Sequence, residues 1–364
     1  MKDHSKRKHL NLIQFSRALV PLFVLLFHAE AFMHIYFDYD FLKLQDVPKS
    51  GGVYYFFALS GFMIYYIYQS DFGNPKKLRD FLVSRFIRIY PIYWILSLCV
   101  LPVYFMYPSF GQGNEHELNT IITSFLLFPN ENEPILSVAW SLVYTVFFYL
   151  VFGINFIKNK TVSRLVLLSW ALVSLGFSAK FFTSAKYYIN FLFNGNNLVF
   201  LVGVLCAFIV MKIKLPRLVA WSIVIIGIFG FPFAWFNTQY QLSHLSLQFI
   251  TSLASGLLIL GLSSIDLQSE INIPTFAKYL GDASFSIYLT HFLIMSVLCK
   301  FFSSTSILAG HYFFISVLLL CVATIGGCFV YTFLEKPLNR SIKAFRSKRA
   351  FRVNGNELPV VERT

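Results

Sequence analysis

Long apolar runs alternate with short polar segments along almost the whole chain. A helix needs roughly 20 apolar residues to cross a bilayer core of about 30 Å. Ten runs approach or exceed that length, at residues 11–36, 51–68, 89–107, 135–157, 162–179, 189–211, 218–236, 246–263, 283–302 and 312–334. Lipid requires each span to satisfy its own backbone hydrogen bonds, and barrel strands would instead show alternating segments of about ten residues. We therefore predict an all-α, polytopic membrane bundle with about ten transmembrane helices.

The composition supports a membrane protein. The 364 residues are 57% hydrophobic and only 13% charged, whereas a soluble domain carries about 25% charged residues. Disordered, collagen-like and disulfide-scaffold classes are excluded. The net charge of +13 suggests nucleic acid at first sight, but the basic residues lie in short blocks between the apolar runs. We expect a lipid bilayer, and no nucleic acid, among the partners of the chain.

The blocks of Lys and Arg predict the orientation, because these residues accumulate on the cytoplasmic side. The two tails and alternate loops together hold 24 of them, against five on the opposite side and Arg17 inside a span. We therefore expect both termini in the cytoplasm, which agrees with an even number of spans. The first run is expected to remain as a span, because it has no convincing cleavage site. The basic tail is expected to contact anionic lipid or to act as a plain cytoplasmic anchor.

Familiar soluble catalytic devices are absent. The five cysteines all lie in apolar runs and form no CxxC pair, and the GxSxG, P-loop and HExxH motifs do not occur. We expect neither a disulfide framework nor a metal site. The chemistry must come from polar residues within the spans, where an ionisable group costs about 2.5–3.5 kcal/mol or more and is a functional candidate by default.

Arg17 and His28 lie in the first span, eleven residues apart. In a helix they share one face to within about 20° and stand about 16 Å apart along the axis. This placement suits a reaction whose reactants arrive from opposite sides. An imidazole, with an unperturbed pKa near about 6.5, can take a proton from a hydroxyl, and a guanidinium can hold an anion or a polarised carbonyl. The alternative is that Arg17 snorkels to the interface and His28 makes an interhelical hydrogen bond.

Arg85 and Arg88 form a second candidate site before the third apolar run. With Lys76, Lys77 and Arg79 they place five cations within thirteen residues. Such a cluster can attract a multiply phosphorylated ligand from the cytoplasm. Retention of positive charge on that side explains the cluster equally well.

Other polar residues interrupt the spans, among them Ser60, Trp140, Tyr288 and His291. His291 lies near the middle of its span and is the best second candidate for a buried proton carrier or ligand contact. Ser60 and its neighbour Gly61 are of the kind that lets helices approach closely. The loop at 108–134 carries four glutamates and neither Lys nor Arg. It can contact sugar hydroxyls or simply be a solvated loop.

The motifs, in their order, resemble the acyltransferase-3 family of membrane O-acyltransferases, especially its exopolysaccharide acetyltransferase branch. The resemblance covers nearly the whole chain. It rests on Arg17, His28, Gly52, Val53, Phe56, Phe57, Ser60, Gly61, Phe62, Arg85, Arg88, Ile89, Pro91, Pro134, Ile135, Leu136, Trp140, Ser141, Leu142, Phe148, Tyr149, Gly281, Asp282, Ser284, Ser286, Tyr288, Leu289, His291, Glu335, Lys336 and Pro337.

The resemblance implies a multi-pass enzyme of the bacterial inner membrane. It would transfer an acetyl or other acyl group from cytoplasmic acyl-CoA to a hydroxyl of a surface polysaccharide, such as O-antigen, lipopolysaccharide or exopolysaccharide, or of a lipid-linked precursor. Acetyl-CoA would be a donor substrate, with no permanently bound cofactor. The acyltransferase-3 domain would span 1–340, followed by a basic cytoplasmic tail at 341–364.

The resemblance also assigns roles to individual residues. His28 and Arg17 match the family's essential histidine and arginine, so His28 is the expected general base. Arg85 and Arg88 match the arginine pair associated with acyl-CoA. The expected substrate-binding residues are Ser60, Trp140, Tyr149, Tyr288 and His291.

The chain departs from the family pattern at two positions. Thr145 stands where members commonly carry a glutamate five residues after the tryptophan, and Val199 replaces another glutamate. Glu30 or an acid of the outer loop can substitute. The loss of these acids keeps other functional classes open: a transporter or exporter of acyl or glycan species, or a structural or sensory scaffold.

Overall fold

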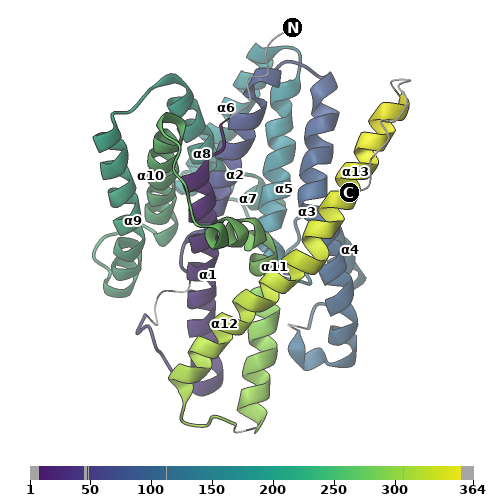
Figure 1. Cartoon of the computed structure of the whole chain (residues 1–364), viewed down its shortest axis with the longest axis vertical. Helices are drawn as coiled ribbons and strands as arrows, with labels where there is room; N and C mark the ends of the chain where they lie inside the picture. Colours follow the sequence, from purple (N-terminus) through teal and green to yellow (C-terminus); the bar gives the residue numbers. More distant parts are fainter. Residues whose placement is uncertain (1–7, 45–46, 48, 112, 306, 354–364) are drawn as a thin grey trace.

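The computed structural model describes residues 8–44, 47, 49–111, 113–305 and 307–353, with side chains through 345. These residues contain no strand and form thirteen α-helices, joined by short 3₁₀ segments and one π-helical turn (Figure 1). The helices are α1 Asn11–Phe37, α2 Gly52–Tyr68, α3 Lys76–Met106, α4 Leu118–Leu126, α5 Trp140–Phe152, α6 Lys160–Ser178, α7 Tyr187–Leu192, α8 Gly195–Lys212, α9 Arg217–Tyr240, α10 Leu247–Gln268, α11 Thr275–Thr305, α12 Tyr312–Val330 and α13 Lys336–Val353.

The predicted all-α membrane fold is confirmed. Within the described residues, nine helical segments are long and apolar enough to cross a membrane. The predicted span at 51–68 is α2, a shorter apolar helix of 17 residues. Every one of the ten predicted runs therefore contains a helix.

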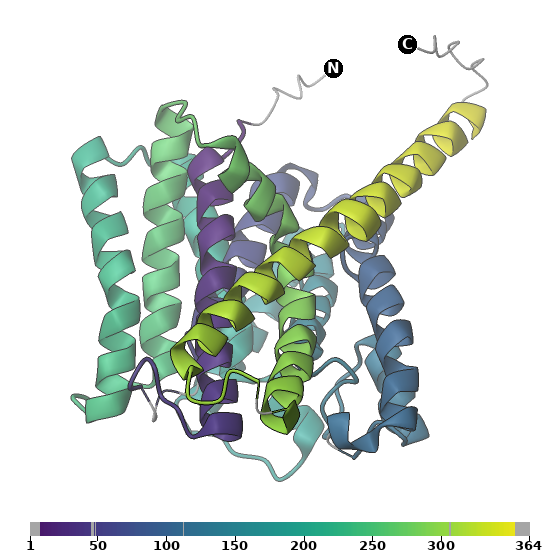
Figure 2. The ribbon, with the colours of Figure 1, turned by 60° about the horizontal axis from the view of Figure 1, so that its bottom comes forward.

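Two helices extend well beyond the predicted apolar runs. α3 begins at Lys76, thirteen residues before the predicted start at 89, so Arg85 and Arg88 lie on the helix itself. α12 continues through the π-helical turn Tyr331–Glu335 into α13, and the resulting rod crosses the front of the bundle in Figure 2. Neither extension was predicted, because both contain charged residues and the prediction relied on apolar runs.

Successive long helices run in opposite directions (Figure 2). The start of α1, the end of α13 and the connections from α5 to α6, from α8 to α9 and from α10 to α11 lie at one end of the bundle, here called the basic end. The connection between α3 and α5, which contains α4, lies toward the opposite end. The connecting segments rich in Lys and Arg thus lie at one end of the molecule, and those poor in Lys and Arg lie toward the other.

Glycines bring α2 and α8 into backbone contact near the centre of the bundle. A Cβ atom on Gly61 would lie 1.9 Å from the carbonyl oxygen of Phe200, and one on Gly203 would lie 1.7 Å from that of Ala58. Neither position accommodates a larger residue without separating the helices. Gly61 therefore has the packing role suggested by its small size.

Two buried carboxylates hold α1 in place. The Asp266 carboxylate, from the end of α10, accepts hydrogen bonds from the backbone N–H groups of Leu12 and Ile13 at 2.9–3.1 Å. It caps the first turn of α1, where N–H groups lack intrahelical partners. At the other end, Glu30 accepts from the backbone N–H groups of Phe41 and Leu42. Asp266 thus anchors the start of α1 to α10, and Glu30 holds the segment after α1 against the helix that carries Arg17 and His28.

Candidate functional site

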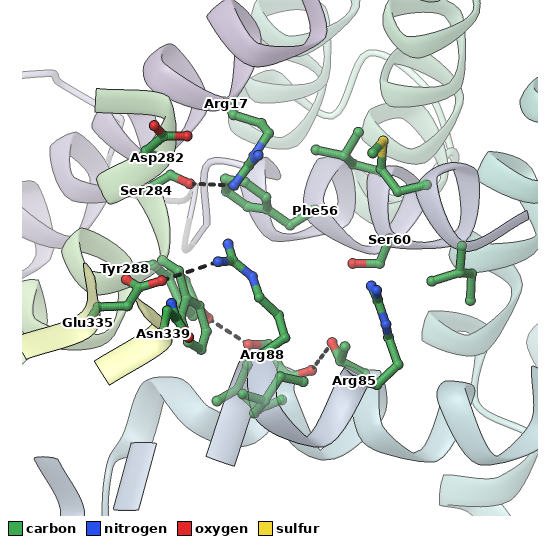
Figure 3. A pocket seen from close by; sticks show the side chains of 18 of the residues that line it. Arg17, Phe56, Ser60, Arg85, Arg88, Asp282, Ser284, Tyr288, Glu335 and Asn339 are labelled. Carbon is green, nitrogen blue, oxygen red and sulfur yellow. Dashed lines mark hydrogen bonds and ion pairs between the residues drawn. The ribbon is translucent and has the colours of Figure 1, made fainter. Parts of the chain in front are cut away.

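A cavity of about 540 Å³ lies between α1, α2, α3, α5, α11 and the joint between α12 and α13. We call it the basic cavity, because its lining includes Arg17, Arg85, Arg88, Lys336, Arg340 and Lys343 against two acids, Asp282 and Glu335. Figure 3 shows the three arginines of α1 and α3 extending into one space. Arg17 is thus brought together with Arg85 and Arg88, whereas Lys76, Lys77 and Arg79 of the predicted cluster do not line the cavity.

Arg17 is held at the wall of this cavity by neighbouring polar groups. Its Nη1 donates to Gln14 Oε1 at 2.9 Å, and its Nη2 donates to Ser284 Oγ at 3.4 Å. Gln14 in turn donates to Asp282 Oδ1 at 2.8 Å. The guanidinium is therefore oriented by α1 and α11 together and faces the cavity, not the surrounding lipid (Figure 3).

Arg85 and Arg88 differ in how they are held. Arg88 Nη1 forms an ion pair with Glu335 Oε1 at 3.2 Å. Arg85 has no carboxylate partner among the described residues: it donates to Tyr68 and Ser84, and its guanidinium lies 5.9 Å from the Tyr149 ring centroid. Its buried Nε has no hydrogen-bond partner in the described part of the chain. Among the described residues the Arg85 guanidinium is therefore held by neutral groups alone and lacks a counter-ion.

The cations of α13 were missed as site residues. Lys336, Arg340 and Lys343 follow one another at helical spacing and present one face to the basic cavity. The i, i+4, i+7 pattern is visible in the sequence, but a basic segment after the last apolar run resembles a solvated tail. α13 is continuous through residue 340, where the two predicted regions meet.

His28 lies in a second, smaller cavity of about 90 Å³, here called the histidine cavity. Val53 and Tyr288 line both cavities, so the two adjoin at these side chains. Lys49, Ser137 and Trp140 also line the histidine cavity, from segments toward the end opposite the basic end. Arg17 and His28, on one helix, therefore face different cavities that meet at Tyr288.

His291 lies beside His28 rather than in either cavity wall. The two imidazole centroids are 5.1 Å apart. His291 Nδ1 donates to the Tyr288 carbonyl oxygen at 2.7 Å, and its buried Nε2 has no partner among the described residues. Because a carbonyl only accepts, Nδ1 carries the proton and Nε2 is left as an acceptor in the neutral ring. The two histidines singled out in the sequence thus form a pair.

The remaining predicted substrate-binding residues are distributed over both cavities. Ser60 and Tyr149 line the basic cavity, Trp140 lines the histidine cavity, and Tyr288 lines both. The Tyr288 hydroxyl donates to the Val138 carbonyl oxygen at 2.9 Å and lies 2.8 Å from Ser141 Oγ. This tyrosine joins α11 to the start of α5.

The positions that lack the family's acids do not face His28. Thr145 lines the basic cavity and donates to the Ser141 carbonyl oxygen, and Val199 is buried in the apolar core. Glu30, considered as a substitute, uses both carboxylate oxygens on the backbone of the segment after α1. The acids of the site are instead Asp282 and Glu335, which were noted only as motif residues. No group of three or more His, Cys, Asp or Glu in the described part of the chain can hold a metal ion.

Known proteins resemble this chain over most of its length. A family model described as an acyltransferase domain matches residues 11–333. The exopolysaccharide production protein ExoZ of Rhizobium meliloti (strain 1021) is 25% identical over 310 residues, which cover 82% of this chain and 92% of that protein. No solved structure matches the chain.

Proposed function

Because the chain belongs to the acyltransferase family that its motifs predicted, we propose that this membrane O-acyltransferase transfers an acetyl group from acetyl-CoA to a hydroxyl of a surface polysaccharide or its lipid-linked precursor. The similarity to an exopolysaccharide production protein supports the polysaccharide as acceptor. The observation that carries the proposal is the meeting of the basic cavity and the histidine cavity at Tyr288 and Val53. A polyanionic donor and an uncharged acceptor would approach this point from opposite ends.

The basic cavity is the proposed donor site. Coenzyme A carries several negative phosphate charges. The cavity lining has six cationic side chains against two acidic ones, so its charge is complementary to this donor. Arg85, which has no carboxylate partner among the described residues, and the α13 cations would hold the phosphates. Guanidinium groups suit this task because their planar fork matches phosphate oxygens. The donor is a substrate, and the proposal includes no permanently bound cofactor.

The proposed chemistry is direct transfer at the junction of the two cavities. The acceptor hydroxyl oxygen attacks the thioester carbonyl carbon while His28 takes the hydroxyl proton. The tetrahedral intermediate then breaks its C–S bond, and the departing CoA sulfur takes the proton from His28. The products are the O-acetyl ester and CoA-SH. Arg17 would place the donor and offset negative charge on the carbonyl oxygen.

The membrane orientation follows from the same proposal. The basic end would face the cytoplasm of a bacterial inner membrane, with both chain termini on that side. Acetyl-CoA would then reach the basic cavity directly, and the histidine cavity would receive the acceptor from the outer side.

Substitution of His28 tests the proposed function. In membranes of the producing strain, His28→Ala should abolish incorporation of label from radioactive acetyl-CoA into the polymer while the polymer is still exported. His34→Ala is the matched control, because His34 lies on the same helix with its side chain 53% exposed. Unchanged acetyl content in the His28 variant would refute the catalytic role. Loss of the polymer itself in a deletion strain would favour an exporter.

A further inference from the structure

A third cavity, of about 140 Å³, lies beside Trp140 at the end of α5 opposite the basic end. We call it the loop pocket, because much of its lining comes from the segment between α4 and α5. α4 contributes Thr123 and Ser124, and the segment after it contributes Phe128, Asn130, Glu131, Asn132, Glu133 and Pro134. The other lining residues are Trp140, Val143, Tyr144, Tyr187 and Phe191. The proposed donor site and the histidine pair do not include it.

α4, which lies next to the segment that forms the pocket, is held against α3. Tyr93 Oη and Trp94 Nε1 donate to the carbonyl oxygens of Ser124 and Phe125, both at 2.8 Å. The segment is tied to α4 in turn, because Ser124 Oγ of α4 accepts from the backbone N–H of Ile135 at 3.0 Å. These contacts join the segment to the middle of α3, so it folds back along the bundle. The pocket is therefore a preformed feature and not the surface of a solvated loop.

The loop pocket adjoins the histidine cavity. Trp140 lines both. Ser137, in the wall of the histidine cavity, donates its hydroxyl hydrogen to Glu133 Oε2, in the wall of the loop pocket. A ligand in the loop pocket would thus lie one side chain away from the space that His28 faces.

The lining chemistry identifies the ligand class. The lining contains neither Lys nor Arg, and Glu131, Glu133, Asn130 and Asn132 give it carboxylates and amides. The two amide nitrogens already donate within the protein, and Glu133 accepts from Ser137, so the Glu131 carboxylate and the amide oxygens are the acceptors proposed for a ligand. An ionised carboxylate accepts hydroxyl hydrogens but repels an anionic ligand. The ligand should therefore carry several hydroxyls and no negative charge.

Aromatic rings form the other wall of the pocket. Tyr144 stacks on Phe191 with centroids 4.5 Å apart, and Tyr187 and Trp140 flank this pair. Such faces pack against the C–H surface of a sugar ring while the polar wall receives its hydroxyls. Resting on the proposed function, we propose that the loop pocket binds a neutral sugar unit of the acceptor and presents its hydroxyl to the histidine cavity.

The test uses the full-length protein in membranes of the producing strain, with the strain's own polymer as acceptor. Tyr187→Ala and Glu131→Gln should each lower incorporation of label from acetyl-CoA about five- to tenfold, the effect of losing one good contact. Binding of labelled acetyl-CoA should stay at the wild-type level. Tyr188→Ala and Asp38→Asn are matched controls: Tyr188 is adjacent to Tyr187, and neither control residue lines the pocket.

Each result bears on one proposal. Unchanged incorporation in both pocket variants, or a parallel loss of donor binding, would overturn the loop pocket as a sugar site. Acetyl groups found only on uronic or other anionic sugars of the native polymer would overturn the neutral specificity. Full incorporation by His28→Ala would instead overturn the proposed function, so the two failures are distinguishable.

Discussion

Arg88 and Glu335, 247 residues apart in the chain, form an ion pair of 3.2 Å at the wall of the basic cavity. The Glu335 side chain is only 2% exposed. Its second oxygen accepts from Ser286 Oγ at 2.7 Å. One carboxylate thus joins α3, α11 and the π-helical turn between α12 and α13, and it holds Arg88 toward the cavity (Figure 3).

Glu335→Gln should destabilise the protein, because it leaves Arg88 without a counter-ion at a partly buried site. Breaking a fully buried pair costs about 3–5 kcal/mol, and the 39% exposure of the Arg88 side chain reduces the expected loss to roughly 1–2 kcal/mol. Thermal unfolding in detergent measures it.

A double-mutant cycle separates the pair from its surroundings. Arg88→Ala combined with Glu335→Gln should cost less than the sum of the single changes. Asp80→Asn is the control, because Asp80 pairs with Lys77 at an exposed position, 3.7 Å away. Additive single effects would contradict coupling between Arg88 and Glu335.

The cations of α13 should contribute to donor binding. Arg340→Ala with Lys343→Ala should raise the KM for acetyl-CoA roughly tenfold, with kcat little changed, because phosphate contacts act before the chemical step. The salt dependence of KM should also weaken. Lys77→Ala with Arg79→Ala removes the same charge near the basic end, from residues outside the cavity lining, and should leave KM near the wild-type value. Equal increases in KM for both double variants would mean that the overall positive charge attracts acetyl-CoA and that the α13 cations do not form a specific binding site.

His291 should act as a positioning residue for His28. Its Nε2 is an unused acceptor beside the imidazole that is proposed to become protonated during transfer. His291→Phe, which keeps a ring but removes this acceptor, should lower kcat by about tenfold or more without changing the KM for acetyl-CoA. Steady-state kinetics on solubilised protein measures the split. A change in KM alone would assign His291 to donor binding.

The sequence predicted the spans well because lipid demands long apolar helices and charge sorting is strong. It grouped Arg17 with His28 and treated Arg85 and Arg88 as a second site, whereas in the structure all three arginines line the basic cavity. The contribution of α13 to the cavity lining was not predicted, because a hydropathy pattern assigns a helix rich in cations to a solvated tail. The hydrogen bonds of Glu30 and Asp266 were not predicted either, because each carboxylate binds backbone N–H groups of another segment. Such tertiary pairings leave no trace in local spacing.

Substitutions of the neighbouring residues Ser60 and Gly61 of α2 should differ in their effect on stability, because one faces a cavity and the other packs against α8. Gly61→Ala places a methyl group against the backbone of Phe200, and overpacking of this kind costs about 1–3 kcal/mol or more. Ser60 faces the basic cavity one residue earlier, so Ser60→Ala should leave the unfolding temperature near the wild-type value. Thermal unfolding of both variants in the same detergent makes the comparison. An unchanged unfolding temperature of the Gly61 variant would contradict this packing role. It would mean that α2 and α8 can separate enough to accommodate the methyl group.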